Sequence, residues 1–549
     1  MIDLFWYIFS WVKTLVIVFL ILDLVFIRTI SIFYKKWYYE RQGIPFCLPV
    51  FPLVGSSIRI KELMKDDENS TFGPFYPLIK ECFGTRPPPI TGVMLLMKPL
   101  LLINSPEYLQ EIYISKNRQA DKDPLGGIVT KPLLGDSIIV MQSNDLWKQK
   151  RHTLAAAFYK DKLIKMTQII KHLVIKRTQE WREKFLKTRQ SFDLMKELNE
   201  IHTNVIMSCA FGVKSTDFKM PYIQDGKTFY LPMGEIITKL VYVISMKAFR
   251  PEIMLFPYIV LLNYSKLDKE WLQNVKTMRD YAKSMILEKI QQLENQNMNS
   301  DQEVQDPDLL TILCQDPTFK DDHEMIISEC IAFFIGGSQT VRSANANIIY
   351  YLTANQDILQ KAYDELNSEI LQNNKPPYDL DRCFDFEKMR ELPYYQMIFN
   401  ESLRIEPPLP ANQMFIFTED TQLGPYYIKN GEGIILNIQQ IHHNPDQWQV
   451  PEKFIPERFD LKSSYYLTPT GQKRNPYSFT PFFGGKRICL GKTFAEIVAK
   501  FVVPLIIIQY EFEFVDKTLY KNKPTINVGM RNKEIELQVQ IKESRLIKK

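Results

Sequence analysis

The stretch FFGGKRICLG, residues 482–491, decides how the rest of the chain is interpreted. It carries Phe482, Gly485, Arg487, Cys489 and Gly491. No second cysteine lies within four residues of Cys489, so a CxxC metal or redox pair is excluded here. The stretch therefore raises the question of which chemistry a single cysteine in a glycine-rich loop can support.

Few protein sites are built from one sulfur atom. A cysteine nucleophile needs a nearby base, and none of the six histidines is close in sequence, although folding could bring one near. Structural zinc requires three or four Cys or His ligands at short spacing, and this loop offers one. Haem iron that is held axially by a thiolate requires a single protein sulfur. We therefore interpret Cys489 as a candidate haem ligand.

The residues around Cys489 suit an axial thiolate. Gly485 and Gly491 allow the backbone to approach the sulfur closely and to point N–H groups at it. The run GKTFAEIVAKFVVPL, residues 491–505, predicts a helix that starts just after the cysteine, and its N-terminal dipole favours the thiolate. Arg487 offers a planar charged group that suits a porphyrin propionate.

The chain as a whole has a globular composition. It contains 549 residues, of which 24% are charged and 45% are hydrophobic. The formal net charge is only +5, from 68 basic and 63 acidic residues, which argues against a nucleic-acid partner. Seven scattered cysteines indicate reduced thiols in a protein that faces the cytosol, not a disulfide scaffold.

The N-terminal segment, residues 1–34, is apolar and aromatic. Its length suits a membrane helix of about 20 residues, so we expect an N-terminal membrane anchor. Lys13 and Asp23 interrupt the segment, and a helix lying in the membrane interface is the alternative. Lys35 and Lys36 follow it, which places the body on the cytoplasmic side.

Two further regions follow the anchor. Residues 35–56 are basic and rich in proline, and Pro45, Pro49 and Pro52 cannot continue a helix. We expect a stiff, extended hinge there. Residues 57–549 then form the body of the protein, which we expect to be the haem-binding catalytic domain.

Helical patterns dominate the body. Long amphipathic or apolar helices are predicted over 144–159, 267–294, 324–352 and 392–408, and residues 296–308 are predicted to be an exposed linker. Strand-like runs are few, at 414–420, 426–438 and 533–541, and Asn430-Gly431 in the second indicates a hairpin turn. The pattern predicts a mainly α fold with small peripheral β-sheets.

The chain resembles the cytochrome P-450 family of haem-thiolate monooxygenases. The family pattern FxxGxRxCxG is met in full by residues 482–491, and the resemblance covers roughly residues 43–545. It implies the cytochrome P-450 fold and haem b (iron protoporphyrin IX) with Cys489 as the iron ligand. It also implies that one oxygen atom from O2 is inserted into a lipophilic substrate.

A second family motif is ExxR, which Glu401 and Arg404 provide. Side chains three apart on a helix share a face and can pair. The run PERF, residues 456–459, lies downstream and contains Arg458. The resemblance implies a buried Glu–Arg–Arg network near the haem. A surface salt bridge worth less than about 1 kcal/mol is the alternative for ExxR by itself.

The resemblance also assigns residues to the haem propionates. Trp147 and Arg151 are four apart and face the same way on their helix. The family often has another arginine shortly after the ExxR helix, but PPLPANQMFIF, residues 407–417, has none. Gln413 is a candidate substitute in that segment.

The run IGGSQTV, residues 335–341, resembles the family motif on the distal side of the haem. Two glycines in a helix cost roughly 1–2 kcal/mol relative to alanines, so we expect the helix to open there for oxygen and water. The resemblance implies that the Thr340 hydroxyl relays protons. Hydrogen bonding of this hydroxyl to a carbonyl one turn earlier is compatible with that role.

Gln339 departs from the family, which usually has a carboxylate at this position. Glutamine cannot take up and release a proton near neutral pH. It could still order a chain of water molecules. Alternatively, the protein is a reductase-independent peroxide isomerase or dehydratase that needs no proton relay. A non-catalytic haem or ligand-binding protein is a further alternative.

Two apolar regions are expected to contact the substrate and the membrane. Apolar side chains predicted to line the pocket are Phe333, Phe334, Ile335, Met414, Phe415 and Ile416. The run MLFPYIVLL, residues 254–262, is a candidate for contact with membrane lipid.

A basic face formed by Lys148, Lys150, Lys486 and Lys492 is a candidate docking site for an NADPH-dependent flavoprotein reductase, with a solvated surface as the alternative. We expect a single-pass protein of the endoplasmic reticulum membrane whose catalytic domain faces the cytosol.

Overall fold

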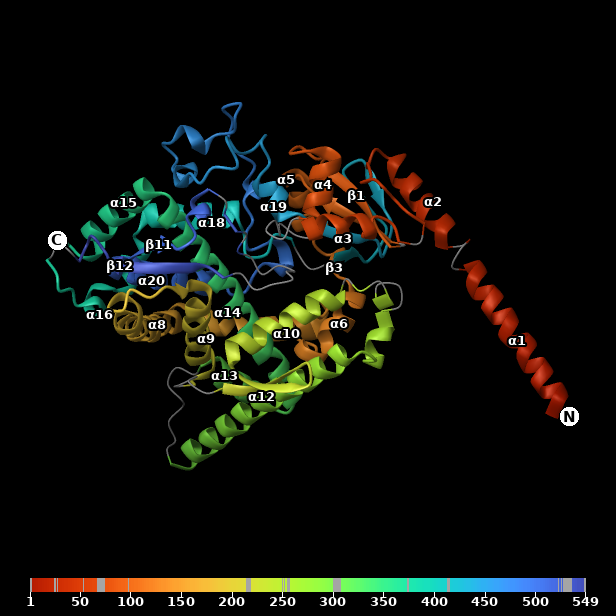
Figure 1. Ribbon diagram of the computed structural model, residues 1–549, viewed down its shortest axis with the longest axis horizontal. Coiled ribbons are helices and arrows are strands. Elements are labelled where there is room, and N and C mark those ends of the chain that lie inside the picture. Colours follow the sequence, from red (N-terminus) through yellow and green to blue (C-terminus); the bar gives the residue numbers. More distant parts are fainter. Residues whose placement is uncertain are drawn as a thin grey trace.

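Helices make up most of the body, and the strands lie in small sheets (Figure 1). The computed structural model describes residues 2–547 apart from 24, 25, 27, 53, 67–74, 97, 214–218, 249, 251, 254–256, 300–307, 373–374, 412–414, 522, 525 and 527–535. The mainly α fold with peripheral sheets is therefore confirmed for the part of the chain that is described.

The long helices occur where the apolar periodicity predicts them. The helices are α1 (Ile2–Leu22), α2 (Arg28–Glu40), α3 (Ser57–Asp66), α4 (Tyr76–Phe83), α5 (Pro106–Tyr113), α6 (Pro124–Leu134), α7 (Asp145–Ala155), α8 (Lys160–Trp181), α9 (Leu194–Phe211), α10 (Met233–Ala248), α12 (Lys266–Asn299), α13 (Leu309–Gln315), α14 (His323–Ala354), α15 (Gln356–Glu365), α16 (Leu380–Cys383), α17 (Phe386–Arg390), α18 (Pro393–Ile405), α19 (Ile438–His442) and α20 (Lys492–Gln509). The side chain of Asn144 caps α7 by accepting a hydrogen bond from the backbone of Trp147.

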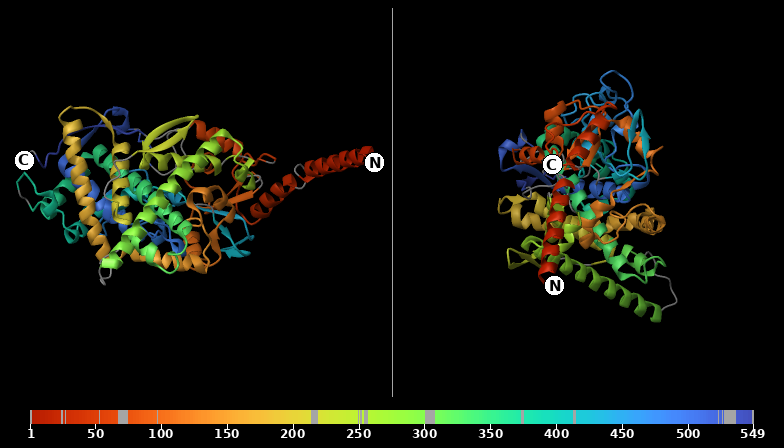
Figure 2. Two further views of the ribbon diagram at one scale, coloured as in Figure 1. Left: turned by 90° about the horizontal axis from the view of Figure 1, so that it is seen from below. Right: turned by 90° about the vertical axis from the view of Figure 1, so that its right-hand side faces the viewer.

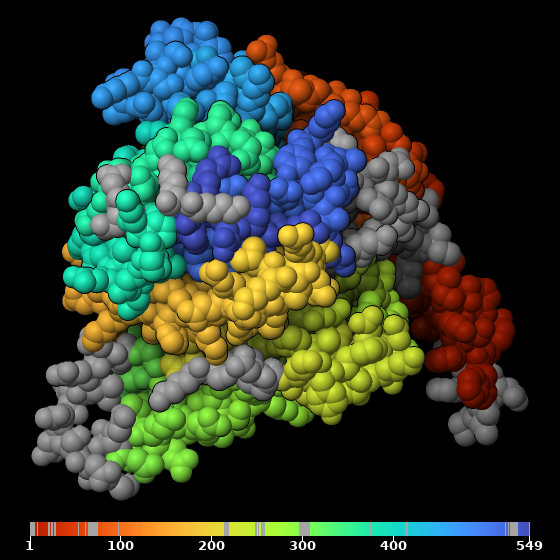
Figure 3. Space-filling view, turned by 60° about the vertical axis from the view of Figure 1, so that its left-hand side comes forward, coloured from red at the N-terminus to blue at the C-terminus, as the bar shows by residue number. Residues whose placement is uncertain are grey.

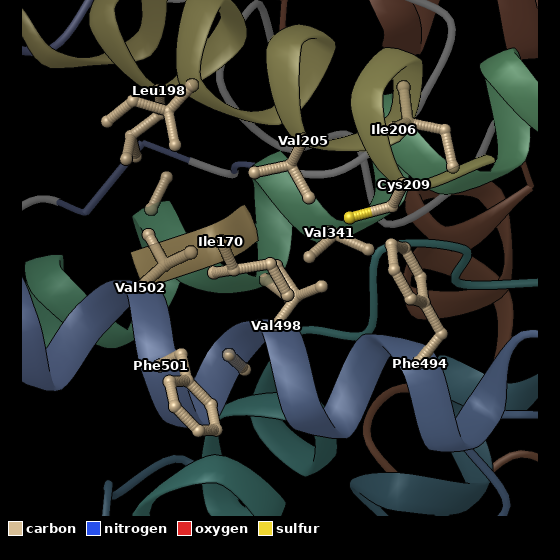
Figure 4. Close-up of a cluster of buried hydrophobic side chains, with 14 of the residues drawn as sticks. Ile170, Leu198, Val205, Ile206, Cys209, Val341, Phe494, Val498, Phe501 and Val502 are labelled. Carbon is tan, nitrogen blue, oxygen red and sulfur yellow. The ribbon is translucent and has the colours of Figure 1, made fainter. Parts of the chain in front are cut away.

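The core lies where α8, α9, α14 and α20 meet. Ile170, Val205, Val341 and Val498 come from these four helices in turn and pack together (Figure 4). α14 is apolar on most sides and runs through the middle of the body (Figure 1). On one face of the molecule, α8 (gold) lies against the C-terminal part of the chain (blue) (Figure 3). The two helices that carry the predicted haem residues, α14 and α20, are thus held by the largest cluster of buried side chains.

The described strands form four small sheets. They are β1 (Ile90–Leu95), β2 (Lys98–Ile103), β3 (Ala120–Lys122), β4 (Phe192–Asp193), β5 (Lys219–Gln224), β6 (Lys227–Pro232), β7 (Phe415–Phe417), β8 (Thr421–Leu423), β9 (Tyr426–Ile428), β10 (Gly433–Leu436), β11 (Tyr510–Phe514) and β12 (Gln538–Glu543). The largest sheet has the order β1-β2-β10-β7-β3, in which β10 runs parallel to β2 and the other pairs are antiparallel. Its last pairing sets Lys122 opposite Phe415, which brings β3 to the wall of the main cavity.

The hairpin predicted at Asn430-Gly431 is wrong. β9 pairs with β8, while β10 belongs to the five-stranded sheet, so the two strands on either side of this turn lie in different sheets. The hairpin instead turns at Gly424-Pro425, where Gly424 has φ of 53°. Asn430 is held by Asp420, whose carboxylate accepts a hydrogen bond from its backbone N–H at 2.8 Å. A local turn signal was overridden by the pairing of β10 with β2 and β7.

The N-terminal helix projects from the body (Figures 1 and 2). Among the described residues, no helix combines the length and the apolar character that a membrane crossing requires, so the predicted span within residues 1–34 is not confirmed. α2 crosses the expected boundary at residue 34 and buries Ile32 and Tyr39. In the expected hinge, Phe46 and Cys47 are buried, and the backbone of Cys47 bonds to Gly92 of β1.

Candidate functional site

A cavity of about 1110 Å³ brings most of the predicted site residues together. Its lining includes Trp147, Arg151, Gly336, Thr340, Phe482, Arg487, Cys489 and Gly491, which come from α7, α14 and the loop before α20. It is at least as large as the pockets of about 300–1,000 Å³ that proteins use for small molecules and cofactors. Gly485 and Gln339 are not part of the lining.

Cys489 presents its sulfur to this cavity. The side chain is accessible although protein surrounds it, because the cavity itself exposes it. Burial raises the pKa of the thiol, and the N–H of Gly491 and the charge of Arg151 only partly oppose this rise. Within the described ranges, no three His, Cys, Asp or Glu side chains gather as a metal site. Among the described residues that line the cavity, Cys489 therefore provides the one sulfur, which fits a thiolate ligand of haem and not a structural zinc site.

The loop before Cys489 is shaped by Gly485. This glycine has φ of 60°, and a Cβ there would lie 2.5 Å from the side-chain oxygen of Asn117. The same oxygen accepts a hydrogen bond from the N–H of Lys486 at 2.9 Å. Because other residues are strained at this φ and would clash, glycine is required here. Gly485 thus shapes the loop from behind the cavity wall.

Arg487 carries the positive charge at one end of the cavity. Its guanidinium pairs with Asp121 at 2.7 Å and donates to the carbonyls of Ile138 and Met141. It also stacks on the ring of Trp147, with the Cζ atom 4.3 Å from the ring centroid. Its Nε is buried and has no hydrogen-bond partner among the described residues. A buried donor without a partner is costly, so this end of the cavity favours an anionic ligand.

Trp147 and Arg151 share this end of the cavity as the spacing predicts. The indole N–H of Trp147 donates to the carbonyl of Ile138 at 3.1 Å, and Arg151 donates to the carbonyl of Ile488 at 2.6 Å. Both therefore line the cavity while bonded to the backbone around it. Their binding to porphyrin carboxylates stays a prediction.

Asp121 and Lys122, at the end of β3, are site residues that sequence reasoning missed. Burial raises the pKa of Asp121, but Arg487 and the backbone N–H of Ser143 outweigh it and bring the pKa to about 2. Lys122 lines the cavity with its ammonium 5.1 Å from the centroid of the Phe415 ring. Burial and the nearby Arg487 lower the pKa of Lys122 to about 7. Asp121 lies 366 positions before Arg487, and no local pattern joins the two.

α14 stays helical across the glycine pair, so the expected opening of the helix is not found. A Cβ at Gly336 would meet nothing within 4 Å, whereas one at Gly337 would lie 2.5 Å from the side chain of Ile206. Gly337 therefore lets α9 approach closely, and Gly336 leaves room on the cavity side. Thr340 lines the cavity and donates its hydroxyl to the carbonyl of Gly336 at 2.6 Å.

Gln339 points away from the cavity. Its side-chain oxygen accepts a hydrogen bond from the Thr238 hydroxyl of α10 at 3.2 Å, and its amide donates to Asn199 of α9 at 3.4 Å. The side chain is only 2% exposed. Gln339 therefore joins the helix under the cavity to two neighbouring helices, and it does not contact the cavity directly.

Glu401, Arg404 and Arg458 come together in the core. Glu401 pairs with Arg404 at 2.7 Å and with Arg458 at 3.0 Å, and all three side chains are fully buried. Further donors of the two arginines reach the backbone carbonyls of His442 and Lys453. The surface salt bridge considered for ExxR is therefore excluded.

Comparisons with known proteins show the family of this chain. A family model for Cytochrome P450 matches residues 69–539. The chain belongs to the cytochrome P450 family. Two relatives of this P450 are 26% identical to it: Cytochrome P450 4F5 of Rattus norvegicus over 426 residues (75% of each chain), and Cytochrome P450 3A11 of Mus musculus over 498 residues (87% of each). Probable cytochrome P450 6a19 of Drosophila melanogaster is 23% identical over 505 residues, 89% of this chain and 91% of that protein.

The residues around the cavity fit the haem of a P450 monooxygenase. Among the described residues of the lining, the sulfur of Cys489 faces the same cavity as the basic side chains of Lys122, Arg151 and Arg487. A buried Arg487 nitrogen lacks a partner among the described residues, and the space beside Gly336 is open. The chain would hold a haem with these groups: a sulfur for the iron, basic side chains for the carboxylates and open space beside α14.

The rest of the lining of the P450 cavity is mostly apolar. Phe333, Ile335, Phe415 and Ile416 line it as predicted. Phe334 does not, because it faces the other side of α14 and is 3% exposed in the core. Met414 and Gln413 lie outside the described residues.

The predicted basic face is smaller than expected. The side chain of Lys148 is 68% exposed and Lys492 is also exposed, while Lys486 is half-buried and pairs with Asp121. The placement of Lys150 on this face is wrong. Its side chain is 1% exposed and pairs with the buried Glu329 of α14 at 3.2 Å, because α7 turns this position toward α14.

Proposed function

We propose that this P450 monooxygenase inserts one oxygen atom from O2 into a C–H bond of a small lipophilic substrate. Two electrons from an NADPH-dependent flavoprotein reductase and two protons reduce the other oxygen atom to water. The single observation that carries the proposal is that Cys489 shares one cavity with Thr340 and with a mostly apolar lining. The haem, in the b form, supplies oxygen activation at a thiolate-ligated iron when it is bound.

The residues of the chain divide the work of binding this group. Cys489 would hold the haem iron through its sulfur, and the loop of Phe482, Gly485 and Gly491 would shape the surroundings of that sulfur. Arg487, Trp147 and Arg151 would bind the carboxylates of the haem, and Lys122 would be a further basic group there in place of the arginine missing after α18. Phe333 and Ile335 of α14 exclude water and contact the substrate.

Thr340 is the candidate for handling protons inside the cavity. Its hydroxyl hydrogen is used on the carbonyl of Gly336, so its oxygen remains able to accept a hydrogen bond from water. Gln339 acts on the other side of α14, where its bond to Thr238 connects this helix to α10. We therefore assign Gln339 a positioning role and Thr340 a direct one.

Association with the endoplasmic reticulum membrane, with the body facing the cytosol, is part of the proposal. Tyr258, Leu261 and Leu262, in the 3₁₀ helix Pro257–Leu262, are 67%, 61% and 71% exposed. Large apolar side chains exposed side by side suit contact with lipid. Residues 1–34 are the proposed single-pass anchor, 35–56 the connection and 57–549 the catalytic domain. The exposed Lys148 and Lys492 are the proposed contacts for an acidic reductase.

The second candidate is a haem-thiolate peroxide isomerase or dehydratase that needs no reductase. One observation favours it: the position usually held by a carboxylate is a neutral Gln339 bonded to neutral partners. A substrate that already contains the O–O bond requires no delivery of two protons. The two functions differ in their need for NADPH and reductase.

Two measurements test the proposal. The first is a carbon monoxide difference spectrum of the reduced protein, with Cys489→Ser as the control. We expect the thiolate-ligated Soret band in the parent and its loss in the variant, whereas a band at the position typical of histidine ligation in the parent would refute thiolate ligation. The second is turnover of lipophilic compounds that shift the spectrum, and of organic hydroperoxides, with and without NADPH and reductase. Rearrangement or dehydration of a hydroperoxide without NADPH and reductase, together with no oxidation of the other compounds with them, would support the peroxide enzyme.

A Gln339→Glu variant tests the positioning role assigned to Gln339. Because this side chain points away from the cavity and bonds to Thr238 and Asn199, we expect a carboxylate there to leave turnover with the electron donor no faster. Unchanged turnover would show that this position takes no part in proton delivery.

A further inference from the structure

Lys150 and Glu329 form an ion pair inside the protein, next to the haem cavity but outside its lining. The side chains are 1% and 0% exposed, and the ammonium lies 3.2 Å from the carboxylate. Lys150 belongs to α7, the helix that carries Trp147 and Arg151. Glu329 belongs to α14, the helix that carries Thr340. The pair therefore joins the two helices that flank the cavity.

Both partners also hold the turn between α6 and α7. Lys150 donates to the carbonyl of Asp136 at 2.7 Å, and the backbone N–H of Ile138 donates to the Glu329 carboxylate at 3.0 Å. The turn begins at Gly135, whose φ is 51° and where a Cβ would lie 2.0 Å from the Ser328 hydroxyl oxygen of α14. Close packing against α14 and two charged hydrogen bonds thus define where Ile138 lies.

Ile138 in turn orients two side chains of the haem site. Its carbonyl accepts the indole N–H of Trp147 at 3.1 Å and a guanidinium N–H of Arg487 at 3.1 Å. One residue therefore bonds to Glu329 through its N–H and to Trp147 and Arg487 through its carbonyl. The side chain of Ile138 lines the cavity as well.

We propose that the Lys150–Glu329 ion pair is a positioning device for the haem site, which sets Trp147 and Arg487 through Ile138. The inference rests on the proposed role of these two side chains in binding the porphyrin carboxylates. Removal of either charge leaves the other buried and unpaired, so the turn at Ile138 shifts and the carboxylate-binding groups lose their alignment. Outer partners of this kind commonly change the affinity of a metal site by about 10–100-fold.

The experiment measures the rate at which haem leaves the purified holoprotein when excess apomyoglobin is present. The variants are Lys150→Met, Glu329→Leu, the double variant and the milder Glu329→Gln. We expect each of the first two to raise the rate of haem loss about tenfold or more. Glu329→Gln keeps an acceptor for the N–H of Ile138, so we expect its rate of haem loss to stay closer to that of the parent. The double variant behaves like the single ones, because the two residues act as one unit.

Two controls separate positioning from general stability. Lys148→Met removes an exposed lysine from the same helix. Lys247→Met removes a buried lysine that pairs with Asp268 at 2.9 Å between α10 and α12. We expect Lys247→Met to lower the melting temperature without speeding haem loss, and Lys148→Met to change neither.

The proposal is overturned if Lys150→Met and Glu329→Leu lose haem no faster than Lys247→Met at a comparable loss of melting temperature. It is also overturned if the effects of the two single variants multiply in the double variant. Should Glu329→Leu not fold, Lys150→Met alone decides by comparison with Lys247→Met. Failure of the proposed function has a different signature, since the parent itself would then lack the thiolate-ligated spectrum.

Discussion

Two clusters of charged side chains lie near the cavity, and they differ in whether all their hydrogen-bond donors have partners. In the cluster of Glu401, Arg404 and Arg458, each side chain is fully buried, and the arginines pair with one carboxylate and with backbone carbonyls. At the carboxylate end of the cavity, Arg487 pairs with Asp121 but keeps one nitrogen without a partner among the described residues. The first cluster is complete within the protein, and the second is not.

This difference separates a structural role from a binding role. A buried network whose members are all satisfied contributes to one defined core, and it has no group left for a ligand. The cavity end instead collects the basic side chains of Lys122, Arg151 and Arg487 in one lining and, among the described residues, leaves a donor of Arg487 unused. We therefore expect the first cluster to control folding and the second to control retention of the haem.

The largest effect is expected in the complete cluster. Glu401→Leu leaves two buried guanidinium groups without their carboxylate and should cost about 3–5 kcal/mol of stability. Thermal unfolding of the holoprotein measures this loss. Glu457→Gln is the matched control, because Glu457 lies beside Arg458 but pairs with Lys361 at the surface. It should cost less than about 1 kcal/mol. Equal losses in the two variants would contradict the comparison.

The next effect is expected at the cavity end. Arg487→Met removes the group that pairs with Asp121 and faces the cavity, and should weaken haem retention by about 10–100-fold. Haem content after purification and the rate of transfer to apomyoglobin measure it. Lys486→Met, which removes the other cation that pairs with Asp121, should retain haem far better because Lys486 does not line the cavity. The comparison would fail if both variants lost haem equally.

A third effect sharpens the comparison through pH. Burial and the neighbouring His443 and Arg404 lower the pKa of His442 to about 3. Between the ordinary value near 6.5 and this value, the unfolded chain binds a proton that the native state refuses. The contribution of His442 to stability is therefore fully present at neutral pH. It decreases by about 1.4 kcal/mol for each unit by which the pH is lowered below about 6.5.

His442→Gln should flatten this acid dependence, because glutamine does not take up a proton in this pH range. Glutamine can still accept the N–H of Thr480 and donate to the carbonyl of Arg404, so the fold should be kept. Melting temperatures at pH 7, 6 and 5 measure the slope, with the exposed His152→Gln as the control. An unchanged slope in His442→Gln would show that other groups govern acid unfolding.

The smallest effect is expected on the far side of α14. Thr238→Val removes the hydroxyl that bonds to Gln339 and should cost about 1 kcal/mol. Because Gln339 does not line the cavity, the haem spectrum should not change. A large shift of that spectrum would mean that the bond between α10 and α14 also sets the geometry of the haem site.

Much of the fold was predictable because its signals are local. Helices such as α14 and α18 follow from apolar periodicity, and the loop before Cys489 follows from glycine and cysteine spacing. The hairpin at Asn430-Gly431 was predicted wrongly because a turn signal carries no information about which distant strand will pair. The burial of Lys150 was missed for a similar reason: a lysine on an amphipathic helix is normally solvated, and only Glu329, 179 positions away, makes its burial possible.

By itself, the sequence determined the family, the single sulfur at Cys489 and the helices that carry it, because these depend on residue types at short, fixed spacings. Tertiary structure alone decided which charges meet. Asp121 reaches Arg487 across 366 positions, and Ile138 joins Glu329 to the side chains of the haem site. The physical reason is that a buried charge is stable only beside a partner, and the chain path that supplies the partner is not encoded in any local pattern.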